Sequence, residues 1–180
     1  MMINRYLAAT VATLLATCAS SSASTTLSGT FAHDNDKARI SFVVGPKAST
    51  VTLTSTGYAS GGFDPVFSLY RAGGHSVAFN DDAGSPDSKL IETLAPGYYA
   101  LYVTQYNNFG PIDLTLSDFP FDGVPDFRGG FIDSYGNQRT GFWSVTLDGI
   151  AAVPEAANAG LLGLGVVAMF AARPRRASRG

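Results

Sequence analysis

The fold is decided by residues 38–55, which read ARISFVVGPKASTVTLTS. In residues 40–44 the large apolar side chains stand at every second position, as Ile40, Phe42 and Val44. Val51 and Leu53 alternate with threonines in the same way. Because successive side chains of a β-strand point to opposite faces, each half predicts a strand with one apolar face. Gly45-Pro46 stands between the halves and favours a chain reversal.

The same alternation continues in both directions along the chain, with breaks at Gly, Pro, Asn and Asp. Candidate strands cover residues 27–32, 38–44, 50–55, 66–71, 76–80, 89–94, 98–105, 112–117 and 143–147. About nine short strands at this spacing predict an all-β domain, a two-sheet sandwich or jelly roll. Residues 118–140 are expected to form a long ordered loop. The side chains expected in the core are Ile40, Phe42, Val51, Leu53, Leu69, Leu101, Val103 and Trp143.

Length and charge narrow the class of protein further. A chain of 180 residues allows one domain of ordinary size. Its 14% of charged residues lies well below the roughly 25% of a typical soluble domain and argues against long solvated helices. Residues 24–153 hold 7 Lys and Arg against 13 Asp and Glu, a formal charge of −6. Such a body repels phosphates, so no nucleic-acid partner is expected.

Residues 1–23 have the organisation of a secretory signal peptide. Arg5 precedes the uncharged apolar run 7–19, and small residues follow it. We expect a signal helix that signal peptidase cleaves between Ala23 and Ser24, which removes Cys18, the chain's one cysteine. The alternative is a lipoprotein modified at Cys18, although a threonine stands directly before that cysteine.

Residues 153–180 have the organisation of a second targeting signal, in three parts. Val153, Pro154 and Glu155 are followed by residues 156–172, which carry no charge. As a helix this run spans roughly 25 Å, at the short end of what a bilayer requires. The basic tail, residues 173–180, is expected to hold the C-terminus on the cytoplasmic side, and its arginines are Arg173, Arg175, Arg176 and Arg179. The alternative interpretation is a plain membrane anchor.

This order of motif, apolar helix and basic tail resembles the PEP-CTERM sorting signal. Residues 153–155 match the start of the family's Val-Pro-Glu-Pro signature, Ala156 departs from its second proline, and residues 160–165 match its Gly/Leu-rich helix. The resemblance implies a Gram-negative envelope protein, a membrane precursor processed by an exosortase and then released to the cell surface or outside. It divides the chain into a signal peptide (1–23), an ectodomain (24–152) and a sorting signal (153–180).

The ectodomain also resembles an exported family that carries such tails and is similar to bacterial pre-peptidase C-terminal domains. The matching residues are 61–70, 80–82, 94–99 and 104–109, and Tyr98 stands in the usual place of a threonine. The resemblance implies a β-sandwich with an accessory or binding role and does not name a ligand.

No catalytic motif stands out in the sequence. His33 and His75 both lie beside turn residues, and no nucleophile elbow, zinc motif or phosphate-binding loop is present. The sequence therefore predicts a protein that is not an enzyme. The alternative is a secreted hydrolase whose site has no recognisable motif.

Clustered oxygen donors at turns form a weaker candidate, a Ca²⁺ site. Ca²⁺ takes six to eight oxygen ligands in flexible loops. The candidate ligands are Asp34, Asp36, Asp64, Asn80, Asp81 and Asp82. The alternative is that these side chains cap turns through nearby backbone N–H groups.

Tyrosines on the second face of the sandwich form the last candidate, a sugar-stacking surface. They are Tyr58, Tyr70, Tyr99, Tyr102, Tyr106 and Tyr135. The alternative is cross-strand packing. Taken together, the sequence predicts a non-enzymatic, exosortase-processed surface or matrix protein associated with exopolysaccharide or biofilm. A Ca²⁺-dependent or carbohydrate-binding module is the alternative function.

Overall fold

A computed structural model describes residues 24–150 of the chain. The predicted signal helix, the transmembrane helix and the sorting motif lie outside these residues. Between residues 24 and 150 no helix has the length and hydropathy needed to cross a bilayer.

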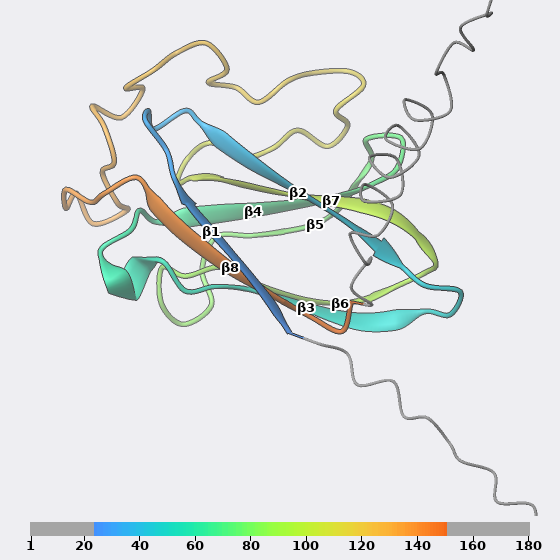
Figure 1. Cartoon of the computed structure of the whole chain (residues 1–180). Coiled ribbons are helices and arrows are strands. Elements are labelled where there is room, and N and C mark those ends of the chain that lie inside the picture. The colour runs from blue at the N-terminus through green and yellow to red at the C-terminus, as the bar shows by residue number, and fades with distance from the viewer. Residues whose placement is uncertain (1–23, 151–180) are drawn as a thin grey trace, which may run out of the picture.

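Eight strands form two antiparallel four-stranded sheets that stack as two layers (Figure 1). The first sheet has the order β1-β8-β3-β6 and the second the order β2-β7-β4-β5. The strands are β1 (Thr25–Thr30), β2 (Lys37–Val44), β3 (Ser49–Ser55), β4 (Pro65–Arg71), β5 (Ser76–Asn80), β6 (Lys89–Leu94), β7 (Gly97–Gln105) and β8 (Phe142–Asp148). A single 3₁₀ turn, η1 (Tyr58–Ser60), is the helical element of the described part. The predicted two-sheet all-β architecture is confirmed.

The strand predicted at residues 112–117 is wrong. These residues form turns, and Asp113 makes only an isolated bridge with His75. The reason is local, because the Asp113 carboxylate accepts hydrogen bonds from the Thr115 N–H (2.8 Å) and hydroxyl (2.7 Å). An aspartate that bonds the backbone two residues later favours a turn over strand pairing.

The core lies between the two sheets, where the apolar faces of the strands meet. Seven of the eight residues predicted for it are buried: Ile40, Phe42, Val51, Leu53, Leu69, Leu101 and Val103. Trp143 is the exception and is half-buried. It lies opposite Gly29 of the edge strand β1, where a Cβ would come within 2.8 Å of the indole ring. The indole ring therefore packs over the backbone of Gly29 at the edge of the sheet, and there Trp143 is only partly covered.

The long loop (residues 106–141) joins β7 to β8 and so connects the two sheets. Figure 1 shows it in yellow to orange beside β2 and β7. Its first part lies on the outer face of the second sheet, where Gly110 N–H donates to the Ser68 hydroxyl and Pro111 accepts from Tyr70. The predicted ordered loop at 118–140 is confirmed, and it extends further than predicted. The part of that outer face that the loop leaves uncovered is the candidate site.

Candidate functional site

The groove is a hollow of about 520 Å³ on the outer face of the second sheet. Its floor is made by β2 and β7, and residues 72–74 with Leu114 border it. The side chains that give it chemical character are Arg39, Arg71, Tyr98 and Tyr102.

Strand register explains why the sheet is hollow here. Tyr98, Ala100 and Tyr102 alternate along β7, and Ser41 of β2 lies directly opposite Ala100. Two small side chains therefore stand between two tyrosines, which are about 13 Å apart along the strand at roughly 3.4 Å per residue. Tyr98 is 70% exposed. The result is an open depression with an aromatic ring towards each end.

Tyr102 is held in place from both sides. Its ring meets Tyr70 edge-on at 5.7 Å and packs against Phe119 of the long loop at 5.3 Å. Below the loop Tyr70 is buried, and its hydroxyl donates to the Pro111 carbonyl at 2.6 Å. Burial raises the pKa of Tyr70 to about 12. One wall of the groove is therefore preorganised by packing.

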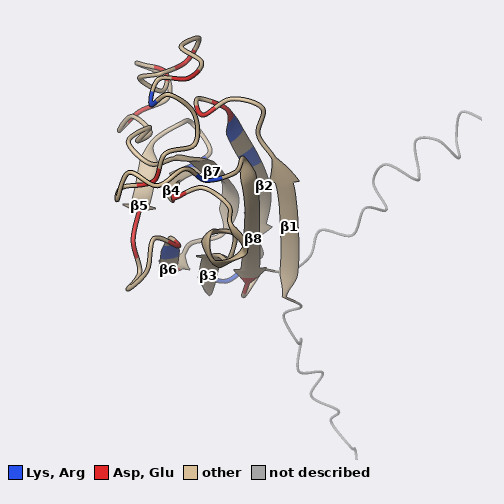
Figure 2. Ribbon diagram, turned by 90° about the vertical axis from the view of Figure 1, so that its left-hand side faces the viewer, with Lys and Arg blue, Asp and Glu red and all other residues tan. Residues whose placement is uncertain are grey.

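The groove is lined by two arginines and by no acidic side chain. Within residues 24–150, neither Arg39 nor Arg71 makes an ion pair, whereas Lys37 pairs with Asp122. Figure 2 shows basic residues on β2 and many of the acidic residues in the loops. The groove is thus a cationic surface on a body whose formal charge is negative.

The structure brings together three of the six tyrosines of the predicted sugar-stacking surface. Tyr70, Tyr99 and Tyr102 do line the groove, but Tyr70 is buried. The Tyr99 hydroxyl donates to the Ala95 carbonyl at 2.9 Å. Tyr98 was missed, although its two-residue phase with Tyr102 places both on one face.

The other three predicted tyrosines lie away from the groove. Tyr58 and Tyr106 pack under arginines at the end of the sandwich, and Tyr135 is 74% exposed in the long loop. No single aromatic face contains all six.

The carboxylates of Asp34 and Asp36 accept hydrogen bonds from backbone N–H groups. Asp34 is fully buried and accepts from the N–H groups of Phe127 (3.0 Å), Arg128 (2.8 Å) and Gly130 (3.2 Å). Asp36 accepts from the N–H groups of Ala32 and His33. Asp34 therefore ties the long loop to the turn after β1, a structural role that sequence reasoning did not anticipate.

The remaining Ca²⁺ candidates occupy the turns around β4 and β5. Asn80 accepts from the Lys89 N–H at 2.8 Å and donates to the Asp82 carbonyl at 3.0 Å, as a turn cap does. Asp64 is buried, with one oxygen bonded by the Ser134 N–H and the other without a partner. Burial raises the pKa of Asp64, and the carboxylates of Asp82 and Asp133 raise it further. In the part of the chain that the structure describes, no three His, Cys, Asp or Glu side chains gather as metal ligands would.

Asp133, which the sequence did not single out, organises the turn near Asp64. Its carboxylate accepts from the N–H groups of Tyr135 and Asn137 and from the Tyr58 hydroxyl. Burial by itself raises the pKa of Asp133, but the hydrogen bonds from Asn137 and Tyr58 outweigh it, so this pKa lies below its usual range. This network fastens the long loop to η1.

The two histidines differ in their surroundings. His33 is exposed in the turn after β1. His75 Nδ1 lies 2.7 Å from Asp113 Oδ2, while the Thr115 hydroxyl bonds the same carboxylate rather than the imidazole. A nucleophile activated by His75 would have to contact the ring itself, and among residues 24–150 no hydroxyl donates to it.

No protein-family model and no curated protein sequence matches the chain. Among solved structures, the chain is similar to the pre-peptidase C-terminal domain of a collagenase from Bacillus anthracis. The two share 16% sequence identity over 68% of this chain and 85% of that domain, with a TM-score of 0.41.

Proposed function

We propose that this protein is an exported, non-enzymatic β-sandwich that binds a saccharide polymer at the cell surface or in the extracellular matrix. Its C-terminal segment directs it there through processing by an exosortase. The groove between Tyr98 and Tyr102 is the observation that carries the binding part of the proposal. The order of motif, apolar run and arginines in residues 153–180 supports the sorting part.

The groove has the chemistry that saccharides require. The C–H face of a pyranose ring packs on an aromatic ring, while its hydroxyl groups need polar partners within reach. Tyrosine supplies both an apolar ring and a hydroxyl, and few rotatable bonds have to be ordered on binding. The depression is open and lies on a sheet face, which suits a chain that passes across it.

A binding experiment tests the first part. The mature protein is purified from an exporting host and run in affinity electrophoresis through gels that contain bacterial exopolysaccharides. Tyr98→Ala is expected to weaken binding at least tenfold. Tyr135→Ala is the matched control, because Tyr135 is exposed to a similar degree but lies in the long loop. Equal binding by wild type and both variants would remove the groove from the proposal.

The same experiment in EDTA tests whether binding requires Ca²⁺. Retention of binding assigns recognition to the groove alone, whereas loss in EDTA and recovery in Ca²⁺ supports the Ca²⁺-dependent alternative. In that case Asp81→Ala is expected to abolish the recovery.

A processing experiment tests the second part. Pro154 has a fixed φ and no N–H, which keeps the segment extended, and it biases Val153 away from helix as well. In cells with an exosortase, Pro154→Ala or Glu155→Ala is expected to accumulate full-length precursor in the membrane fraction. Ala156→Pro, which completes the Val-Pro-Glu-Pro signature, is the control and is expected to be processed. If all four proteins show the same size and fraction, the sorting proposal fails.

A further inference from the structure

We infer that the groove selects acidic polysaccharides, whose sugar carboxylates pair with Arg39 and Arg71. This inference rests on the proposed saccharide-binding function and adds the class of polymer. It begins from the two arginines, whose guanidinium groups make no ion pair within the described residues.

The charges in and around the groove are distributed unevenly. The body carries 13 acidic residues against 7 basic ones, yet no Asp or Glu lines the groove. The guanidinium groups of two other basic residues, Arg128 and Arg139, donate hydrogen bonds to backbone carbonyls. Arg39 and Arg71 have no hydrogen bond of this kind, so their donors are available to a ligand.

The sheet places the two arginines on either side of the tyrosine strand. Arg39 of β2 pairs in register with Tyr102, and Arg71 of β4 pairs with Tyr99, so β7 runs between them. Neighbouring strands lie about 4.8 Å apart, and Tyr99 and Tyr102 are three residues apart along β7, so the Cα atoms of Arg39 and Arg71 lie roughly 14 Å apart, diagonally across the sheet. Arg39 lies on the outer face beside Tyr102, whereas Arg71 has the phase of the buried Leu69 and lines the groove from the exposed end of β4. A polymer lying along β7 would therefore meet Arg39 beside Tyr102 and Arg71 at the rim of the groove.

Guanidinium chemistry favours carboxylates as the acidic group. The planar guanidinium group of arginine donates two parallel hydrogen bonds to one carboxylate. It also stacks on the faces of aromatic rings. Uronic-acid polymers carry such carboxylates on rings that present C–H faces to tyrosine. The negative charge of the rest of the body opposes a polyanion as dense as nucleic acid.

The decisive comparison uses polygalacturonate and the same polymer after reduction of its carboxyl groups. Wild type is expected to bind the acidic polymer at least tenfold more tightly than the reduced one, with affinity falling as salt rises. Arg39→Gln and Arg71→Gln are each expected to weaken binding of the acidic polymer about threefold to tenfold without changing binding of the reduced polymer.

Two variants serve as controls. Lys47→Gln removes the same charge from the turn between β2 and β3, outside the groove, and is expected to change nothing. Arg39→Lys keeps the charge without the planar guanidinium group and is expected to recover only part of the affinity. A melting curve for each variant confirms that the fold is intact.

The outcomes separate the two proposals. Equal affinity for both polymers, lost in Tyr98→Ala, overturns the acidic-polymer inference and leaves saccharide binding standing. Binding of the acidic polymer that neither arginine variant weakens also overturns the inference. Equally tight binding of polyglutamate shows that charge alone is recognised and overturns it as well. Binding of neither polymer, nor of any other saccharide, removes the proposed function too.

Discussion

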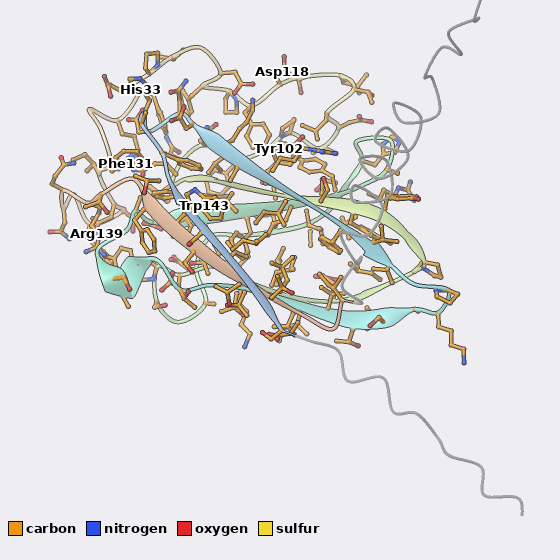
Figure 3. All side chains as sticks on the ribbon, viewed as in Figure 1. His33, Tyr102, Asp118, Phe131, Arg139 and Trp143 are labelled. Carbon is orange, nitrogen blue, oxygen red and sulfur yellow. The ribbon has the colours of Figure 1, made fainter. Side chains whose placement is uncertain are left out.

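Tyrosine and arginine meet in two regions of this molecule, and the two regions use them differently. At the end of the sandwich, Arg139 lies over the Tyr58 ring at 3.8 Å and donates to the Gly62 carbonyl at 2.9 Å. Arg128 lies over Tyr106 at 4.9 Å in a similar way. In the groove, the arginines have tyrosines beside them but make no such hydrogen bonds. Figure 3 labels one residue of each region, Arg139 near η1 and Tyr102 over the second sheet.

The difference shows that residue type alone does not mark a binding surface. Near η1 the Arg139 guanidinium donates to the carbonyls of Tyr58 and Gly62, and Arg128 donates to carbonyls within the long loop, so these two arginines hold the fold together. In the groove, the guanidinium groups of Arg39 and Arg71 have no carbonyl or carboxylate partner among the described residues. Availability of hydrogen-bonding capacity separates the structural role of Arg128 and Arg139 from the binding role proposed for Arg39 and Arg71.

The largest effect is expected at the end of the sandwich, from Asp34→Ala, because Asp34 accepts the Arg128 N–H there. The substitution leaves three N–H groups of the long loop without their acceptor, at a buried site. Each buried donor left without an acceptor costs about 1–3 kcal/mol, so three of them should lower the free energy of unfolding by at least about 3 kcal/mol. Urea denaturation measures it. Asp36→Ala, which removes a carboxylate with two exposed bonds, should cost about 1 kcal/mol. Equal losses for the two variants would contradict the conclusion that Asp34 ties the long loop to the turn after β1.

Gly110→Ala is expected to cost about 2 kcal/mol by overpacking. A Cβ on Gly110 would stand 2.2 Å from the Tyr70 hydroxyl and 2.8 Å from Ser68 Oγ, where the long loop meets the sheet. Gly45→Ala is the control, because nothing lies within 4 Å of its Cβ position. If the two variants melt at the same temperature, the loop does not press on the sheet at Gly110.

The next largest effect is a dependence of the free energy of unfolding on pH, which arises from the buried Tyr70. Because burial raises its pKa from 10.0 to about 12, the folded state keeps Tyr70 neutral after the unfolded chain has begun to ionise. Its contribution to stability is therefore complete below pH 10 and is lost as pH rises towards 12. Tyr70→Phe is expected to reduce the slope of unfolding free energy against pH in this window. Urea denaturation from pH 9 upward measures that slope, and an unchanged slope would mean that the loop leaves Tyr70 open to water.

The smallest effect is expected in the groove itself. Tyr98→Ala and Arg39→Gln alter exposed side chains and should change the free energy of unfolding by less than about 0.5 kcal/mol. The same urea measurements provide the value. A loss above about 1.5 kcal/mol for either variant would place these residues among the structural ones, like Arg139.

Much of the fold was predictable because the decisive pattern is local. Where one face of a strand is buried, as at Ile40 and Phe42, the alternation is visible in the sequence and the strand was found. At residues 112–117 the alternation was present without a sheet to join, and the Asp113 side chain formed a turn instead. Trp143 was expected in the core between the sheets, but its indole ring packs over Gly29 of the edge strand β1 and is only half-buried.

The candidate site was predictable only in part. Aromatic residues on the second face were noted, yet which of them stay open depends on where the long loop lies. Tyr70 and Tyr102 share the outer face, and the loop buries the first while leaving part of the second accessible. The phase of Tyr98 with Tyr102 places it on the same face, but its 70% exposure depends on where the long loop lies, which no short-range pattern shows.

The sequence by itself determined the strands, the turns between them and the two-layer class, because these follow from the alternation of side chains and from local turn chemistry. It also contains the motifs that predict export and sorting. Only the tertiary structure decided which polar groups are satisfied. The Asp34 carboxylate accepts from N–H groups of residues 127–130, more than ninety positions further along the chain. The Arg39 side chain makes no ion pair among the described residues. Such pairings depend on how the loop crosses the sheets, and that path is set by packing between distant segments rather than by any neighbouring residue.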